Sequence, residues 1–313
     1  MFIRELELEE FRSYRRLDLQ LEPAGLRLVG PNASGKSTLL EAVAMLATTR
    51  SPRATTERDL INWRSGEDFG VPPFFRARGV IVRGDGETTV EIGLQVDAGR
   101  PTATRKRIRV DERPVRASDA VGRLRAVLFS PEDVALVTNS PSSRRRYLDL
   151  TIAQIDSAYL RALARFARVL EQRNSLLKTL HRERVAPRSA QAAGQLAFWD
   201  QHLVAEGALV IAGRARFIDR LAERARGRFA ELSAHGTLEA VYRSSVERGP
   251  GSLVESRTMP GAAIARDYQF QIEAARDDEL RRGVSLIGPH RDDLGLLLDG
   301  VDLAAFGSRG QQR

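Results

Sequence analysis

The sequence predicts an α/β fold with two parts, a mixed sheet that includes an antiparallel β meander and a lobe of long helices. Three observations carry this prediction. Residues 30–38 match a phosphate-binding loop, residues 77–110 contain alternating or β-branched runs, and residues 148–232 repeat apolar side chains at helical spacing. At 313 residues the chain exceeds one ordinary core, so we expect two lobes.

The phosphate-binding loop lies between a predicted strand at 26–29 and a predicted helix at 38–46. In this context, backbone N–H groups and Lys36 would hold the β- and γ-phosphates of ATP, and the Ser37 hydroxyl would ligate Mg²⁺. Lysine is rare in this chain, since Lys36, Lys106 and Lys178 are the three among 49 lysines and arginines. The predicted ATP site comprises Gly30, Pro31, Asn32, Ala33, Ser34, Gly35, Lys36, Ser37 and Thr38.

Composition limits the class of protein. The absence of cysteine excludes disulfides and thiolate metal sites, and no apolar run approaches the length of a membrane span. We therefore expect a cytoplasmic protein without a membrane anchor. The net charge of +8 favours a polyanionic partner, although compositional bias or heat tolerance would also enrich arginine.

The remaining elements follow from the apolar pattern along the chain. Before the loop we expect two strands, 3–8 and 17–21. After the loop we expect an antiparallel meander at 77–82, 88–96 and 105–110, followed by a short buried strand at 127–129. Two helical runs, 148–170 and 196–232, would pack as an antiparallel arm. In the last part we expect strands at 238–246, 284–287, 294–298 and 301–303, and one helix at 262–282. The domain limits predicted from these patterns are 1–138 for the sheet part, 139–236 for the arm and 237–313 for a return to the first part.

A surplus of positive charge lies in the arm. Residues 144–184 contain ten Lys or Arg and four Asp or Glu, a surplus of six in a chain whose total is eight. Such arginines would contact DNA phosphates without reading bases. The candidates are Arg144, Arg145, Arg146, Arg161, Arg165 and Arg168. An ordinary solvated helix face is the alternative, and residues 144–146 could instead pair with acidic residues.

Three further motifs stand outside chance composition: 130–133 with 140–149, 288–293 and 307–313. Together with the phosphate loop and residues 10–14, they resemble the RecF family of ABC-type ATPases, which is related to SMC heads. The resemblance spans the whole chain. Asn139 stands where the family usually has glycine, and Arg309 where glutamine is common.

The resemblance implies an ABC-type P-loop ATPase head whose signature is Ser308, Gly310 and Gln311. In that class the signature contacts the γ-phosphate bound by a second subunit, so a homodimer would form on ATP. The family picture is a recombination mediator in DNA repair, replication and the SOS response. It binds double- and single-stranded DNA at gaps or junctions and, with RecR and RecO, helps to load RecA.

The resemblance assigns nucleotide-binding residues but no catalytic residues. The family's Walker B strand would follow the signature, so the catalytic residues are unknown, and the sequence resembles a C-terminally truncated member. Residues 296–299 imitate that strand, but Gly300 replaces its glutamate. We expect slow DNA-dependent hydrolysis from the complete protein and negligible turnover from these residues. A nucleotide-gated DNA-binding module without turnover is one alternative, and an ABC transporter ATPase, which would not explain the basic arm, is another.

Two acidic motifs leave their roles open. Glu132 and Asp133 could lie near Mg²⁺ or the attacking water, or could cap a helix. For His290, Arg291, Asp292 and Asp293 a polar turn is favoured over a catalytic or metal site.

Overall fold

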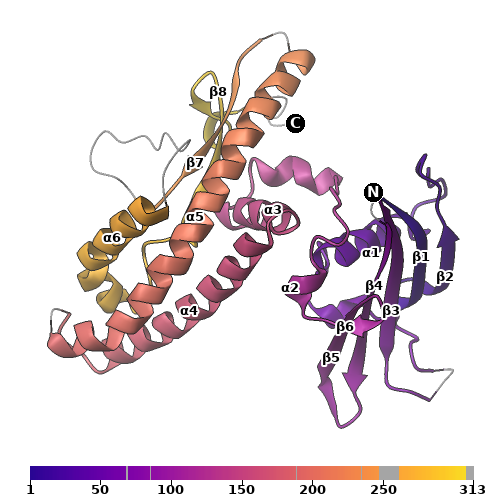
Figure 1. Cartoon of the computed structure of the whole chain (residues 1–313), viewed down its shortest axis with the longest axis horizontal. Helices are drawn as coiled ribbons and strands as arrows, with labels where there is room; N and C mark the ends of the chain where they lie inside the picture. The colour runs from indigo at the N-terminus through magenta and orange to yellow at the C-terminus, as the bar shows by residue number, and fades with distance from the viewer. Residues whose placement is uncertain (68–69, 85, 188, 234, 247–260, 308–313) are drawn as a thin grey trace. The chain divides into compact units, whose positions relative to one another are not determined.

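The computed structural model describes residues 1–67, 70–84, 86–187, 189–233, 235–246 and 261–307. Contacts within the chain divide it into two compact units (Figure 1). Unit 1 comprises Met1–Leu128 and Ala153–Ser157, and unit 2 comprises Phe129–Ile152 and Ala158–Arg313. The three segments predicted from the sequence, 1–138, 139–236 and 237–313, remain a prediction about functional organisation.

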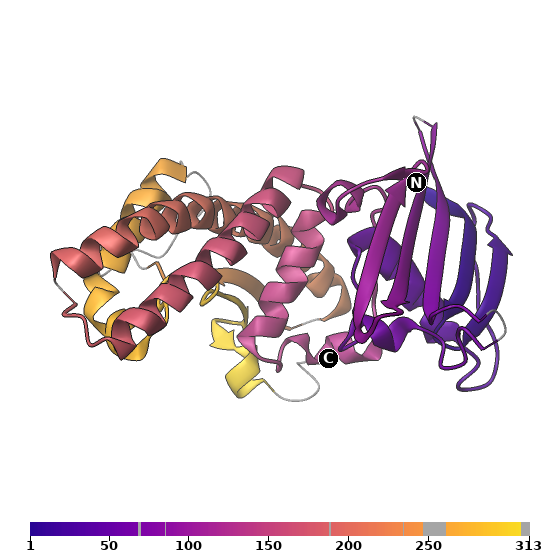
Figure 2. The ribbon, with the colours of Figure 1, turned by 90° about the horizontal axis from the view of Figure 1, so that it is seen from below.

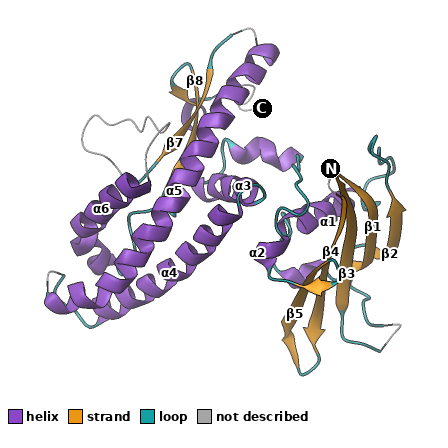
Figure 3. Ribbon diagram, viewed as in Figure 1, coloured by secondary structure: helices purple, strands orange, loops and turns teal. Residues whose placement is uncertain are grey.

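Unit 1 is built on a six-stranded sheet in the order β2-β1-β3-β4-β5-β6 (Figure 3). Every neighbouring pair is antiparallel, which confirms the predicted meander. The strands are β1 (Phe2–Phe11), β2 (Tyr14–Gln20), β3 (Phe74–Arg83), β4 (Gly86–Asp97), β5 (Arg100–Val110) and β6 (Arg113–Pro114). Because side chains alternate along a strand, one face of the sheet is apolar and the other is charged.

The apolar face packs against α1 (Lys36–Thr48). Leu6, Ile81 and Ile92 from three strands are fully buried beside Leu46 of the helix. A Cβ at Gly79 would lie 3.0 Å from Leu46 Cδ1, so the glycine in β3 allows this close approach. Two short elements, η1 (Glu57–Leu60) and α2 (Ala117–Ala120), complete the unit.

Two predicted strands of this unit are wrong. Residues 26–29 and 127–129 have no strand conformation, and no described strand pairs with them. Their apolar side chains are exposed, by 83% at Val29 and 92% at Val127. An apolar run becomes a strand only where neighbours satisfy its backbone and cover its side chains, and the described part of the sheet offers neither. The described strands are accordingly all antiparallel rather than mixed.

Unit 2 contains the predicted helical arm. Its helices are α3 (Pro141–Ala153), α4 (Ser157–Arg182), α5 (Ala190–Leu232) and α6 (Gly261–Arg282), with short η2 (Pro131–Leu136) and α7 (Leu303–Phe306). α4 and α5 form a hairpin in which α5 extends along the whole arm (Figure 1 and Figure 2). The single run predicted over 148–170 is split between α3 and α4, because residues 154–156 are not helical. The Gln154 side chain accepts a hydrogen bond from Ala126 N in this break.

Glycines let aromatic side chains pack closely on α5. A Cβ at Gly207 would lie 2.5 Å from Tyr268 of α6, and one at Gly213 would lie 2.5 Å from Tyr159 of α4. Both distances are too short for a real Cβ, so these two positions require glycine. Ser189 caps the start of α5 by accepting a hydrogen bond from Ala192 N at 3.1 Å.

A buried ion-pair cluster joins three helices of unit 2. Arg173 of α4 is fully buried and donates to Asp200 of α5 at 2.7 Å and to Glu279 of α6 at 2.6 Å. Its third nitrogen donates to Ser285 Oγ at 2.7 Å, and Arg276 donates to the second oxygen of Asp200 at 2.5 Å. We call these residues the Arg173 cluster.

A three-stranded antiparallel sheet, β7-β8-β9, lies against α5. Its strands are β7 (Leu238–Arg243), β8 (Asp293–Leu298) and β9 (Val301–Asp302). The β8–β9 hairpin turns at Asp299 and Gly300, whose φ values of 50° and 79° suit the predicted turn. The strand predicted at 284–287 is wrong, because its N–H groups bond to side chains: Ser285 N donates to Asn174 Oδ1 and Leu286 N to Glu279 Oε1. Among the described helices, none combines the length and apolar character needed to cross a membrane.

Candidate nucleotide-binding site

The phosphate-binding loop lies at the N-terminus of α1. Ala33 and Gly35 both have left-handed φ values, 63° and 91°, and Gly35 is the N-cap of the helix. Residues 30–34 are exposed at the surface, and Gly35 and Lys36 are half-buried. The first N–H groups of a helix have no intrahelical partner, so this terminus is suited to phosphate oxygens.

The Lys36 ammonium lies across the loop. Its Nζ donates to Gly30 O at 2.8 Å and Pro31 O at 2.6 Å, and it lies 3.3 Å from Ser34 Oγ. These bonds hold the charge within the turn formed by residues 30–36. The loop therefore combines one ammonium with the free donors of a helix start, which is the chemistry that β- and γ-phosphates require.

Tyr14 supports the loop, a role that the sequence did not reveal. Its hydroxyl donates to Gly35 O at 3.2 Å. A Cβ at Gly35 would lie 2.8 Å from the same hydroxyl, so both the left-handed φ and this contact require glycine. From the sequence, Tyr14 was included only as one residue of the motif at 10–14 and had no assigned role.

A second contact joins the β1–β2 turn to α1. The Arg12 guanidinium donates two bonds, of 2.8 and 3.2 Å, to the buried carboxylate of Glu41. Ser51 also donates to Glu41, and Asn62 Nδ2 donates to Arg12 O at 2.6 Å. Because the turn and the helix are tied together, the start of α1 is held in place beside Tyr14.

The metal ligand remains a prediction. Ser37 is exposed in the first turn of α1, where its hydroxyl is open to an ion bound by nucleotide phosphates. Among the described residues, no group of three or more His, Asp or Glu side chains could hold a metal. The predicted magnesium ion would be held by the Ser37 hydroxyl together with phosphate oxygens of the nucleotide. Ser308, Gly310 and Gln311 of the predicted signature lie outside the described residues.

The predicted DNA-binding arginines fall into two groups. Arg144 is buried and donates to both carboxylate oxygens of Asp293, at 2.8 and 2.7 Å, and to three backbone carbonyls. Arg145 donates to Asp292 O at 2.8 Å, whereas Arg146 is exposed. The structure thus favours the internal-pairing alternative for Arg144, because a buried guanidinium with five acceptors cannot reach a phosphate.

The second group lies on the exposed face of α4. Arg161, Arg165 and Arg168 are all exposed and follow the three- and four-residue spacing of one helix face. Arg165 also forms an ion pair with Glu206 of α5 at 2.6 Å. Their role in DNA contact remains a prediction.

The comparisons with known proteins identify the family. Residues 5–178 match a family model described as an AAA domain. A protein of Thermomicrobium roseum named "DNA replication and repair protein RecF" is 48% identical over 320 residues, which cover 100% of this chain and 79% of that protein. A protein of the same name from Roseiflexus castenholzii is 46% identical, with the same coverage. The chain belongs to the RecF family.

Solved RecF structures agree with this assignment. The chain is similar to "Structure of the recombination mediator protein RecF-ATP in RecFOR pathway", with a TM-score of 0.83 and 28% identity over 100% of this chain and 78% of that one. A second RecF structure, whose name includes "RecF-ATPrS", gives a TM-score of 0.84 at 27% identity. The predicted ABC-type α/β fold with a helical arm is therefore confirmed.

The acidic motif at residues 130–133 caps a helix. The Asp133 carboxylate accepts from Ser130 N at 2.6 Å and from Ser130 Oγ at 2.9 Å, at the start of η2. The Ser130 side chain also accepts from the Asp133 backbone N–H, so the two residues form a capping box. Of the two roles left open for Asp133, the structure favours capping.

The motif at residues 288–293 forms a polar turn, as predicted. Asp292 is buried and accepts from Ser245 N at 2.6 Å and from Ser245 Oγ at 2.8 Å, and also from the Tyr242 hydroxyl. Burial raises the pKa of Asp292. Gly288 has a φ of 128°, and a Cβ there would overlap the Tyr268 hydroxyl, which donates to Ile287 O at 3.1 Å. The turn therefore ties β7 and α6 together.

His290 is expected to make the stability of unit 2 depend on pH. Its Nε2 lies 3.1 Å from Ser285 O, its buried Nδ1 has no partner among the described residues, and burial, with Arg291, lowers its pKa to about 4. Below about pH 6.5 the imidazole of His290 binds a proton in the unfolded chain but stays neutral in the folded protein. The free energy of unfolding therefore decreases as the pH falls toward 4. We expect a loss on the order of 2 kcal/mol between about pH 7.5 and pH 5.

Urea unfolding at the two pH values, in the protein and in His290→Gln, measures this loss. The variant retains a donor for Ser285 O but cannot titrate. Its unfolding free energy should change less between the two conditions. Equal pH dependence in both proteins would show that other groups cause the loss.

Proposed function

We propose that this protein is an ATP-dependent DNA-binding recombination mediator that acts at gaps or junctions and helps to load RecA. The observation that carries the proposal is the phosphate-binding loop at the start of α1, with Lys36 held across it, in a chain of the RecF family. Related structures are named as RecF with ATP in the RecFOR pathway, which supports ATP as the nucleotide.

ATP would act as a dimerisation ligand in this proposal. The loop of one copy would bind the triphosphate, and Ser308, Gly310 and Gln311 of a second copy would close over its γ-phosphate. Two identical contacts of this kind form a two-fold interface. The dimer would then present two basic arms to DNA, and RecR and RecO would be further partners, as the pathway named for the related structures suggests.

The proposal is tested by fluorescence anisotropy with gapped, duplex and single-stranded DNA, together with sedimentation. We expect ATP and Mg²⁺ to increase both the dimer fraction and the affinity for gapped DNA, relative to ADP or no nucleotide. Identical sedimentation and affinity with and without ATP would contradict an ATP-gated dimer. Binding of DNA without any response to ATP would leave only a nucleotide-independent DNA-binding protein.

The exposed arginines of α4 supply the second prediction. Changing Arg161, Arg165 and Arg168 to glutamate should weaken duplex binding by about tenfold or more and reduce the salt slope by roughly 2 to 3, since each phosphate contact adds about 0.9. Anisotropy titrations over a range of salt concentrations measure both quantities.

A matched control separates a specific contact from total charge. Changing Arg220, Arg224 and Arg226 of α5 to glutamate alters the net charge equally on another helix of the same unit. The α4 variant should lose more affinity than the α5 variant. If the two variants bind duplex equally well, α4 is not the DNA-binding face.

A further inference from the structure

The charged face of the unit 1 sheet carries a basic surface that the function above does not use. β5 places Ile108 and Val110 toward the apolar core and points Arg105, Arg107 and Arg109 to the opposite face. Residues with the same orientation in a strand recur every ~6.8 Å, twice the rise per residue. β5 therefore presents three arginines in a straight row.

A hollow lies beside this row because one position in β4 has no side chain. Gly93 pairs with Arg76 of β3 on one side and with Arg107 of β5 on the other. The space above it measures about 200 Å³ and is bounded at one end by Glu91 and at the other by Gln95. A Cβ at Gly93 would meet only a backbone oxygen at 3.7 Å, so the hollow is not needed for packing.

The charges around the hollow are only partly neutralised. Glu91 accepts from Arg76 at 2.7 Å and forms an ion pair with Arg109 at 3.4 Å. Arg105 and Arg107 are exposed, and among the described residues neither forms an ion pair. The β5 side of this face therefore has two positive charges available to an anionic ligand.

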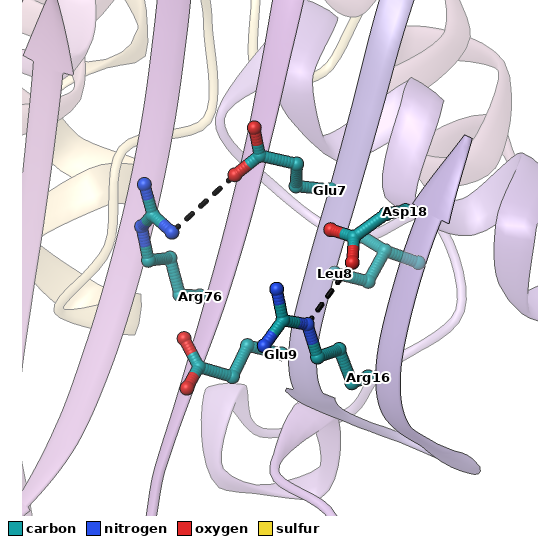
Figure 4. A pocket seen from close by; sticks show the side chains of 6 residues that line it. All are labelled: Glu7, Leu8, Glu9, Arg16, Asp18 and Arg76. Atoms are coloured by element: carbon teal, nitrogen blue, oxygen red, sulfur yellow. Dashed lines mark hydrogen bonds and ion pairs between the residues drawn. The ribbon is translucent and has the colours of Figure 1, made fainter. Parts of the chain in front are cut away.

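The neighbouring half of the same face differs. There a depression of about 180 Å³ is lined by Glu7, Glu9, Asp18, Arg16 and Arg76 (Figure 4). Arg16 pairs with Asp18 at 3.0 Å and Arg76 with Glu7 at 3.5 Å, as the dashed lines in Figure 4 show. Carboxylates outnumber arginines in this depression, so an anion is repelled here and directed toward β5.

An aromatic side chain completes the basic surface. Phe74 begins β3 and lines the hollow, in the same cross-strand row as Gln95 and Arg105. Its backbone N–H and C=O both bond to Ser65 Oγ, at 3.0 and 2.8 Å, so its position is held. A half-buried ring beside a row of arginines is the combination that binds single-stranded nucleic acid, because bases stack on rings while arginines contact phosphates.

We propose that the outer face of β3–β4–β5 binds single-stranded DNA, with phosphates along Arg105 and Arg107 and a base held over Gly93 beside Phe74. An acidic protein segment would also be attracted by the arginines, but it would not require an aromatic ring beside a shallow open space, whereas a nucleotide base would. The inference deepens the DNA-binding part of the proposed function and places a second contact in unit 1, apart from α4.

The test uses fluorescein-labelled oligothymidine without nucleotide. Changing Arg105 and Arg107 to glutamate should lower its affinity about tenfold or more and reduce the salt slope by about 1.4, since each phosphate contact on a single strand adds about 0.7. Phe74→Leu should lower the affinity about tenfold through lost stacking. The charge-matched control, Arg123→Glu with Arg125→Glu, changes exposed residues of the same unit and should have a smaller effect.

Gly93→Val provides a variant that leaves the fold intact. A β-branched residue suits a strand and fits the open space, so thermal stability should be unchanged or raised while oligothymidine affinity falls. Three results would overturn the proposal: equal effects of the β5 pair and the control pair, an unaltered affinity in Gly93→Val, or a β5 effect on a polyglutamate peptide without one on oligothymidine.

The same measurements keep this inference separate from the proposed function. ATP-dependent binding of gapped DNA is followed in parallel for the β5 pair and for the α4 triple variant. If ATP-dependent binding is present while the β5 pair leaves oligothymidine affinity unchanged, only the present inference fails. If ATP has no effect while the β5 pair still weakens oligothymidine binding, only the proposed function fails.

Discussion

Replacing Lys36 with alanine is expected to lower the affinity for ATP by about a hundredfold or more, which corresponds to about 3 kcal/mol. The reason is geometric as well as electrostatic. The ammonium is held within the loop by Gly30 O and Pro31 O, where a triphosphate would also lie. No other side chain of residues 30–38 carries a positive charge, so the variant cannot compensate. Isothermal titration calorimetry with ATP and Mg²⁺ measures the loss.

Lys178→Ala is the matched control for this experiment, because Lys178 is an exposed lysine of α4 in the other unit. It should bind ATP as the unaltered protein does. Thermal unfolding of Lys36→Ala should be close to that of the parent, since the side chain is not part of the core. Equal heats of ATP binding in the two variants would mean that the loop is not the nucleotide site.

The second large effect concerns stability. Arg173→Met should lower the unfolding free energy by about 3 to 5 kcal/mol, because it leaves the buried carboxylates of Asp200 and Glu279 without their shared partner. Burial opposes the charge on Arg173, but Glu279 and Asp200 outweigh it and raise the pKa of the guanidinium. The cation is therefore present at every accessible pH, and its removal leaves two buried carboxylates whose charge must be hydrated or neutralised.

Urea unfolding measures this loss, with Arg168→Met on the exposed face of α4 as the control. The control should change stability by no more than about 0.5 kcal/mol, as is usual for exposed positions. A loss below about 1 kcal/mol in Arg173→Met would show that water replaces the guanidinium. In that case the Arg173 cluster would not hold α4, α5 and α6 together.

The periodic parts of the fold could be predicted from the sequence. Alternation at Leu6 and Leu8, and helical spacing at Tyr159 and Phe166, mark the sides that become buried. The hairpin turn at Asp299 and Gly300 could be predicted because few residue pairs adopt two consecutive left-handed φ values without strain. The phosphate loop was readable for a related reason, since its backbone demands particular residues at fixed spacing.

What could not be predicted depends on distant neighbours. Residues 26–29 have the composition of a strand, but nothing in the run says whether another strand will pair with it. Arg144 and Arg161 are the same residue in similar helical patterns, yet one is buried against Asp293 and the other faces solvent. Tyr14 could not be assigned to the loop because 21 positions separate it from Gly35. The roles of Ser37 and of the signature residues remain predictions.

The length of α5 has a mechanical consequence. A continuous helix of 43 residues is a rod roughly 64 Å long, at 1.5 Å per residue. Tilting such a rod by one degree displaces its far end by roughly 1 Å. Because α5 packs closely against α6 at Gly207 and against α4 at Gly213, the two neighbouring helices would move together with it. A small change in the tilt of α5 at one end would thus produce a much larger displacement of the helix at its other end.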